Sequence, residues 1–145
     1  IIKTLYSTVS GKTITFFGWA FKKDTNDTRE SAAIYVADLL IDEQAIIKVY
    51  DPKVTAPQMQ SDLNYLKSRS ENENINFLKT QNNPYTASKG AHAIAVLTEW
   101  DEFKTLDWKR IYNSMQKPAF VFDGRNILNQ SHLEQIGFIY RGIGS

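Results

Sequence analysis

The sequence contains no cysteine among its 145 residues and only two histidines, His92 and His132. The lack of cysteine excludes disulfides, thiolate metal sites and a cysteine nucleophile within this chain. The two histidines are far apart, and neither has a partner at the spacing of metal ligands. We therefore expect no metal ligand here and place both histidines at the surface or at a helix edge.

The sequence also lacks a large net charge and a long apolar run. A formal net charge of +1 gives no general attraction to nucleic acid or to an anionic membrane. No apolar run approaches the ~20 residues that span a bilayer. We expect neither nucleic acid nor membrane as a partner, so any anion site must be local. The 42% hydrophobic and 23% charged residues predict a folded globular domain.

Short β-branched and aromatic runs alternate with segments of helical periodicity along the chain. This alternation predicts an α/β fold with an open, doubly wound, mainly parallel, Rossmann-like sheet of about five strands. The expected strands, some with their following turns, lie within residues 13–21, 45–50, 93–100, 119–126 and 138–144.

Two segments need separate interpretation. Ile1, Ile2 and Leu5 have helical spacing, so we interpret residues 1–10 as the end of a helix that begins upstream, followed by a domain over residues 11–145. Residues 55–83 are polar and weakly periodic, and we expect a variable, partly helical surface segment with a mobile tip and no chemistry.

Two helix starts are predicted from capping boxes. Asp27 and Glu30 predict the start of a helix over about Arg29–Asp42, whose apolar face would pack on the sheet. Ser131 and Glu134 predict the start of a short helix before the last strand.

Polar residues follow the expected strands, where ligands bind in open α/β sheets. Lys22 and Lys23, with a helix N-terminus just beyond, predict an electropositive pocket. The planar fork of Arg125 suits bidentate recognition of a phosphate or carboxylate, so a diphosphate would fit this set. The alternative is a solvated lysine loop, with Arg125 paired to Asp123 or Glu99.

The glycine pattern argues against a dinucleotide site in this chain alone. Trp19 and Ala20 follow Gly18 where a G-x-G-x-x-G motif would supply further glycines. Asp51 lies 33 residues after Gly18, whereas the acidic residue that binds the ribose is expected about 20 residues on. We interpret Asp51-Pro52 as a structural strand stop.

Four aromatic residues near the expected loops could stack on a base. The spacing of Trp100, Phe103 and Trp108 favours the core, most strongly for Trp108 on its helix. Trp19, beside the loop after the first strand, is left open between the two roles.

Several motifs in order resemble a known family: "GWAFKKDTNDTRES", "YDPKV", "GAHAIAVLTEWDEFKTLDWKRIYNSMQKPAFVFDGRN" and "IGFIYRGIG". They are similar to the C-terminal, UDP-binding domain of the UDP-glucose 6-dehydrogenases in the UDP-glucose/GDP-mannose dehydrogenase family. The resemblance runs from Ile1 to Gly144 and is weakest over 55–83.

The resemblance implies a role within a larger cytoplasmic enzyme. That enzyme oxidises UDP-glucose to UDP-glucuronate in two NAD-dependent hydride transfers. It has an N-terminal NAD domain, a central helical region that builds the dimer, and this domain for the UDP part, so a homo-oligomer is expected. The catalytic cysteine and the G-x-G-x-x-G motif would lie upstream, so we expect no catalytic residue here and an inactive isolated chain.

The resemblance also implies roles for four residues. Phe21, Lys22 and Arg125 match substrate-binding positions, and Arg29 matches an arginine that reaches toward NAD across the interdomain cleft. Two alternatives stay open. One is a domain of another nucleotide-sugar dehydrogenase, for UDP-N-acetylmannosamine or GDP-mannose; the other is a noncatalytic nucleotide-binding or assembly module.

Overall fold

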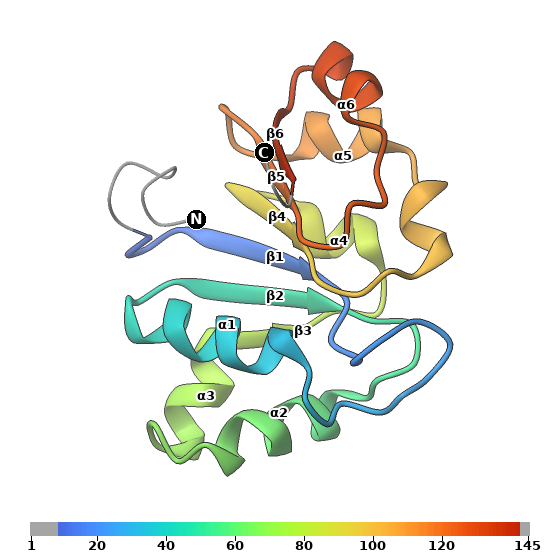
Figure 1. The fold of residues 1–145 in the computed structure, drawn as a ribbon. Coiled ribbons are helices and arrows are strands. Elements are labelled where there is room, and N and C mark those ends of the chain that lie inside the picture. Colours follow the sequence, from blue (N-terminus) through green and yellow to red (C-terminus); the bar gives the residue numbers. More distant parts are fainter. Residues whose placement is uncertain (1–8, 143–145) are drawn as a thin grey trace.

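The computed structural model describes residues 9–142 and contains a six-stranded sheet in the order β3-β2-β1-β4-β5-β6 (Figure 1). Every neighbouring pair of strands is parallel. The expected doubly wound α/β fold is confirmed, with one strand more than the five predicted. The strands are β1 (Thr13–Phe17), β2 (Ile46–Tyr50), β3 (Leu78–Thr80), β4 (Ala93–Val96), β5 (Phe120–Asp123) and β6 (Ile139–Gly142).

Helices form two groups around the sheet. In Figure 1, α1 (Ala32–Asp42) runs alongside β2, with α2 (Ala56–Tyr65) and α3 (Glu71–Phe77) beside it. The second group consists of α4 (Pro84–Ser88), α5 (Trp108–Ser114) and α6 (Gln130–Ile136), with a 3-10 turn, η1 (Asp101–Lys104). No helix within residues 9–142 is both long and apolar enough to cross a membrane.

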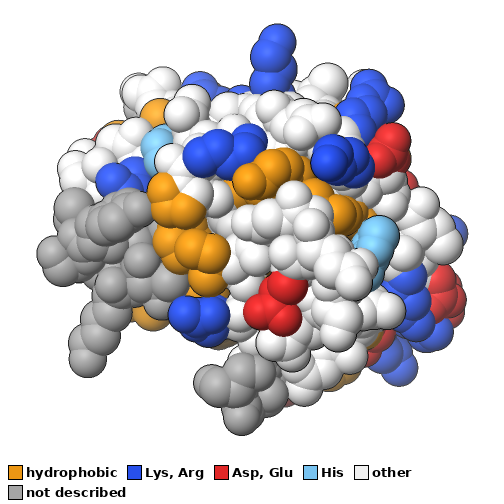
Figure 2. Space-filling view, turned by 90° about the horizontal axis from the view of Figure 1, so that it is seen from above, with side chains coloured by type: hydrophobic (Ala, Val, Ile, Leu, Met, Phe, Trp, Pro, Cys, Tyr) orange, Lys and Arg blue, Asp and Glu red, His pale blue; other side chains and the backbone are white. Residues whose placement is uncertain are grey.

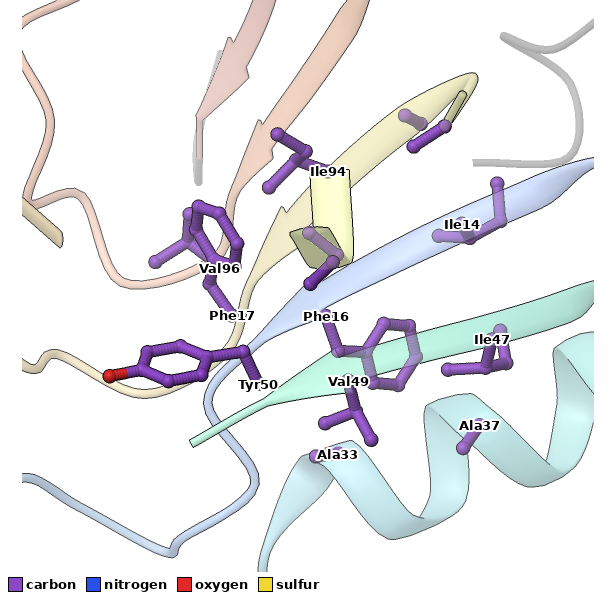
Figure 3. Packing of buried hydrophobic residues seen from close by; sticks show 14 of the residues in the cluster. Ile14, Phe16, Phe17, Ala33, Ala37, Ile47, Val49, Tyr50, Ile94 and Val96 are labelled. Carbon is purple, nitrogen blue, oxygen red and sulfur yellow. The ribbon is translucent and has the colours of Figure 1, made fainter. Parts of the chain in front are cut away.

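The central strands are buried on both faces, as parallel strands covered by helices should be. Phe16 and Phe17 of β1 are both fully buried. Figure 3 shows Ala33 and Ala37 of α1 directed toward β2. On the opposite face Phe17 stacks on Phe103 with ring centroids 5.1 Å apart. Alternate side chains of β1 therefore join the two halves of the core.

Both predicted capping boxes are wrong. Helix α1 begins at Ala32, and its cap is Ser31, whose Oγ accepts the Ala33 amide and donates to the Trp19 carbonyl at 2.6 Å. Glu30 adopts a positive φ of 61° instead of a helical conformation. The cap of α6 is Asn129, which accepts the amide of His132. In both helices a neighbouring polar residue offers the better-placed oxygen.

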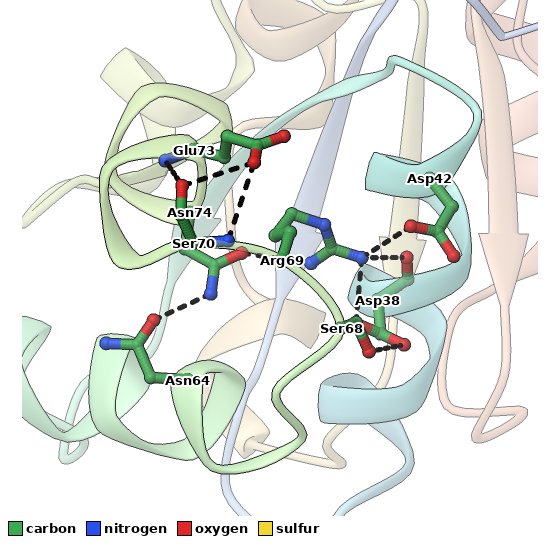
Figure 4. Close-up of polar contacts among 8 residues, drawn as sticks. All are labelled: Asp38, Asp42, Asn64, Ser68, Arg69, Ser70, Glu73 and Asn74. Carbon is green, nitrogen blue, oxygen red and sulfur yellow. Dashed lines mark hydrogen bonds and ion pairs between the residues drawn. The ribbon is translucent and has the colours of Figure 1, made fainter.

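Residues 55–83 are partly helical, as expected, but they are more ordered and more buried than the expected surface segment. They form α2, α3 and the edge strand β3, with Met59, Leu63 and Leu78 buried. Arg69 holds this segment to α1 by bonding the side chains of Asp38 and Asp42 at 2.8 and 2.9 Å (Figure 4). The segment is therefore an integral layer of the fold.

The expected helix end over residues 1–10 lies outside the described residues except for its last two positions. Val9 is buried, and Ser10 is in a turn with Gly11. The expected last strand is described as far as Gly142.

Candidate functional site

The loops after β1, β2, β4 and β5 meet at the carboxyl edge of the sheet, as the sequence predicts. Phe17, Val96 and Asp123, the last residues of β1, β4 and β5, lie level across neighbouring strands. The segments that follow these positions are joined to one another by side-chain hydrogen bonds. This edge therefore brings together residues more than 100 positions apart in the sequence.

Gly18 allows the β1 loop to pass directly over the β4 loop. Its φ is +105°, and a Cβ there would lie 2.4 Å from Cβ of Thr98. Thr98 Oγ1 in turn donates to the Ala20 carbonyl at 2.7 Å. The glycine at the first strand–loop junction thus serves a contact within the protein, and the space a phosphate would need there is filled by Thr98.

Asp51 binds the same loop from the other side. Its buried carboxylate accepts the amides of Trp19 at 2.7 Å and Ala20 at 2.9 Å, and the Nε1–H of Trp100 at 3.1 Å. The other oxygen accepts the amides of Lys53 and of Val54, the residue after it. The structural interpretation of Asp51 is confirmed, because its oxygens are already engaged by donors of this chain.

The aromatic residues near the edge are core residues. Trp100, Phe103 and Trp108 are buried, so that prediction is confirmed. Trp19 is fully buried too, and its Nε1–H donates to Asp62 at 3.0 Å. Phe21, 41% exposed, is the aromatic ring of this loop that solvent reaches.

Phe21 and Lys22 stand at the tip of a closed loop. The Phe21 amide donates to the Asp27 carbonyl at 2.8 Å, which closes the turn over residues 21–27. Lys22 is exposed, and its ammonium makes no hydrogen bond or ion pair within residues 9–142. The ammonium of Lys23, by contrast, pairs with Asp101 at 3.4 Å. Of the two lysines proposed for the pocket, Lys22 is the one left available.

Arg125 forms the ion pair that was its alternative interpretation. One guanidinium nitrogen, Nη2, donates to Glu99 Oε2 at 2.8 Å, and the Arg125 backbone amide donates to Asp123 Oδ1 at 3.2 Å. The side chain is still 32% exposed. Glu99 also accepts the amide of Lys23 at 2.9 Å, so the same pair joins Arg125 to the loop of Phe21 and Lys22.

Burial would raise the pKa of Glu99, but hydrogen bonds from Arg125 and from the Lys23 amide outweigh burial and lower it below its ordinary value. Glu99 is therefore ionised at neutral pH and holds its donors as a carboxylate.

Asp123, which the sequence analysis named only as an alternative partner of Arg125, accepts the backbone amide of Arg125. It is buried and also accepts the Leu128 amide and the Tyr140 hydroxyl, both at 2.8 Å. Burial, followed by the Asp123 carboxylate, raises the pKa of Tyr140 to about 12. The one available signal was the strand-end position of Asp123, since Tyr140 lies 17 residues on.

Within residues 9–142 the Arg29 side chain bonds Asp27 and neither Arg125 nor Glu99. The side chain of Arg29 is 88% exposed and forms an ion pair with Asp27 at 2.9 Å. The Arg29 guanidinium lowers the pKa of Asp27 to about 2, through a side-chain hydrogen bond first and a backbone hydrogen bond second. Arg29 borders a hollow of about 240 Å³ that Tyr35 and Tyr65 also line. It lies before α1, not at the helix start that the sequence predicted.

Basic side chains do not gather into one field on the face shown in Figure 2, where they are scattered among neutral and apolar side chains. Within residues 9–142, no three His, Asp or Glu side chains are grouped as metal ligands would be. The two cations that the candidate site combines, Lys22 and Arg125, come from the separate loops after β1 and β5.

Comparison with known proteins gives a specific match. The family model described as "UDP-glucose/GDP-mannose dehydrogenase family, UDP binding domain" matches residues 15–130. The UDP-glucose 6-dehydrogenase of Caenorhabditis elegans is 50% identical over the whole chain, and that of Drosophila melanogaster is 48% identical over 99% of it. The chain spans 30% of the length of each relative.

Solved structures agree. A UDP-D-ManNAc dehydrogenase from Pyrococcus horikoshii superimposes on 99% of the chain with a TM-score of 0.71 and 27% identity, and the match covers 28% of that structure. An NDP-N-acetyl-D-galactosaminuronic acid dehydrogenase from Methanosarcina mazei has a TM-score of 0.76 over 99% of the chain and 26% of its own. At 24% identity, the second match shows the fold alone.

Proposed function

The chain belongs to the UDP-glucose/GDP-mannose dehydrogenase family as its UDP binding domain, and we propose that it binds the UDP part of UDP-glucose within an NAD-dependent UDP-glucose 6-dehydrogenase. The observation that carries this proposal is the junction at the carboxyl edge. There a carboxylate joins the loop of Phe21 and Lys22 to Arg125, although these residues lie a hundred positions apart in the sequence.

The chemistry of these side chains suits a nucleoside diphosphate. The Lys22 ammonium and the unused donors of Arg125 would offset the charge of two phosphates. The exposed ring of Phe21 gives an apolar surface beside them. UDP-glucose and its product UDP-glucuronate share this part, so both would bind here.

The residues of this chain do not fit NAD as a main binding site. The Gly18 turn is filled by Thr98, and the carboxylate of Asp51 is engaged by donors of the chain itself. NAD would be held mainly by an N-terminal domain of the same polypeptide, with exposed Arg29 reaching toward it. The hydride transfers and the covalent chemistry belong to that other part, and the chain alone would be inactive.

The wider proposal follows the curated relatives, of which this chain spans about a third. In this proposal residues 11–145 are the UDP-sugar-binding domain. The complete enzyme is a cytoplasmic homo-oligomer.

The binding proposal is tested by titrating the 145-residue chain with UDP in a calorimeter. Lys22→Ala and Arg125→Ala should each weaken binding about tenfold, since each removes a charge-assisted contact. Lys109→Ala and Arg110→Ala, exposed cations on α5, are matched controls and should bind as the wild type does. Equal affinities for all four variants would contradict the proposed site.

The reaction is tested on the full-length enzyme that contains this chain. UDP-glucose should support NADH formation, whereas UDP-N-acetylmannosamine and GDP-mannose should not. No NADH from UDP-glucose in a folded enzyme would exclude the proposed activity, and a preference for either other sugar would identify the alternative dehydrogenase.

One observation favours an additional role in assembly. Tyr35 and Leu39 of α1 and Tyr65 of α2 are large apolar side chains exposed on one group of helices. Such side chains suit a contact with another chain or domain. If assembly were the only role, Lys22→Ala and Arg125→Ala would change neither oligomeric state nor any ligand affinity.

A further inference from the structure

Glu99 lies in the loop after β4, between the two halves of the candidate site. It follows β4, and β4 lies between β1 and β5. The loop of Phe21 and Lys22 follows β1, and Arg125 follows β5. A side chain at the end of β4 can therefore reach both loops at once.

The two oxygens of Glu99 are divided between these loops. Oε1 accepts the amide of Lys23 at 2.9 Å, and Oε2 accepts Nη2 of Arg125 at 2.8 Å. The first partner is 76 residues away in the sequence and the second 26. A single carboxylate thus fixes the distance between two segments that have no strand pairing with each other.

The contact with Arg125 leaves most of the guanidinium for a ligand. Only one of its nitrogens is bonded to Glu99, and the side chain remains partly exposed. A guanidinium carries five N–H donors in a rigid fork. An end-on contact of this kind sets the direction of the fork without occupying it.

We propose that Glu99 is a positioning residue for nucleotide binding, which holds the loop of Phe21 and Lys22 in register with the guanidinium of Arg125. This inference rests on the proposed function, because it concerns the same site. It gives Glu99 no contact with the ligand.

The two possible effects of Glu99 on UDP binding, positioning of the site and repulsion of the phosphates, predict opposite changes in affinity when Glu99 is removed. A negative side chain beside a diphosphate repels it, so if charge alone mattered, removing Glu99 would tighten binding. If Glu99 positions the site, Glu99→Ala should weaken UDP binding about tenfold. Glu99→Gln, which keeps one acceptor oxygen, should weaken it about threefold. Glu102→Gln, at the neighbouring carboxylate that bonds Tyr50, is the matched control and should bind normally.

Coupling to Arg125 separates positioning from a general loss of structure. In an Arg125→Ala background, Glu99→Ala should cost less than about threefold, because part of its effect acts through the arginine. Amide hydrogen exchange at Lys23 should quicken about tenfold in Glu99→Ala, while exchange in β1 and β4 stays unchanged.

The outcomes are separable. No UDP binding by the wild-type chain would refute the proposed function and the inference with it. Wild-type or tighter binding by Glu99→Ala and Glu99→Gln would overturn the inference alone, as would unchanged exchange at Lys23. If Glu99→Ala does not fold, Glu99→Gln decides by the same affinity and exchange measurements.

Discussion

Arg69 and Arg125 are both paired with carboxylates, yet their surroundings differ in a way that separates structure from binding. The Arg69 side chain is 6% exposed, and its nitrogens bond two carboxylates, the Asn74 amide oxygen and the Asp38 carbonyl (Figure 4). Arg125 is 32% exposed and bonds one carboxylate oxygen through its side chain.

This difference shows which arginine is available to a ligand. A buried guanidinium must have its donors satisfied within the protein, because an unpaired buried charge is very unfavourable. Arg69 meets that demand and joins α1 to the segment that carries α2 and α3. Arg125 has guanidinium donors that bond no other residue within 9–142, at the edge where the loops converge. An ion pair alone therefore does not distinguish a structural arginine from a ligand-binding one. The number of unused donors and their exposure to solvent distinguish the two.

The largest effect on stability is expected at Arg69, the arginine whose donors are bonded within the protein. Arg69→Ala leaves Asp38 and Asp42 without their cation and should lower the free energy of unfolding by about 3 kcal/mol, the lower end for a broken buried pair because Asp42 is partly exposed. Urea unfolding of the variant measures this, with Arg110→Ala on α5 as the control. UDP affinity of the folded variant should not change. A stability loss no larger than the control's would remove the distinction between the two arginines.

Substitution of Arg125, the partly exposed arginine, should affect UDP affinity more than stability. Arg125→Ala should weaken UDP binding by about 1.4 kcal/mol, or tenfold, yet lower the free energy of unfolding by less than about 1 kcal/mol, as for an accessible ion pair. Arg125→Lys keeps the charge without the planar fork, so it should recover only part of the affinity. Calorimetry and urea unfolding on the same samples give both quantities. A stability loss as large as that of Arg69→Ala would show that this pair is structural.

The surroundings of Arg125 can be predicted from the sequence better than those of Arg69. Strand ends can be found from apolar runs, and the residues after them include Phe21, Lys22 and Arg125. Residues 55–83 gave no comparable pattern, since α3 buries only the polar Asn74. That segment is held by side-chain bonds such as Asn74 to Asn64 at 2.6 Å, which leave no hydrophobic period in the sequence.

The arrangement within the site was also beyond the sequence. The bonds that Glu99 accepts from Lys23 and Arg125, and the bond that Asp123 accepts from Tyr140, span 17 to 76 residues, and no local spacing encodes them. The predicted cap of α1 was wrong for a similar reason. Ser31 is selected over Asp27 by its bond to the Trp19 carbonyl, a contact that exists only after the β1 loop has folded.

A smaller effect on stability is expected at Tyr140, which bonds the same Asp123 carboxylate that accepts the Arg125 amide. A phenol with a raised pKa favours the folded state below pH 10, its ordinary pKa, and this contribution is lost as the pH rises from about 10 to about 12. Tyr140→Phe should lower stability by about 1 kcal/mol at pH 8 and reduce its alkaline decline. Urea unfolding from pH 8 to 11.5 measures both effects, with Tyr65→Phe at an exposed position as the control. If the variant lost stability at high pH as the wild type does, the Tyr140 hydroxyl would not be the cause of that loss.

The smallest effect on the isolated chain is expected at Arg29. Its pair with Asp27 is open to solvent, where such pairs contribute little to stability and are screened by salt. Arg29→Ala should therefore leave both the unfolding midpoint and the UDP affinity of this chain unchanged. In the full-length enzyme the same substitution should raise the KM for NAD several-fold and leave the KM for UDP-glucose unchanged, because Arg29 bonds Asp27 and neither Arg125 nor Glu99 within residues 9–142. A weaker UDP affinity in the isolated variant would place Arg29 in the substrate site, and the comparison would then involve two open arginines instead of one.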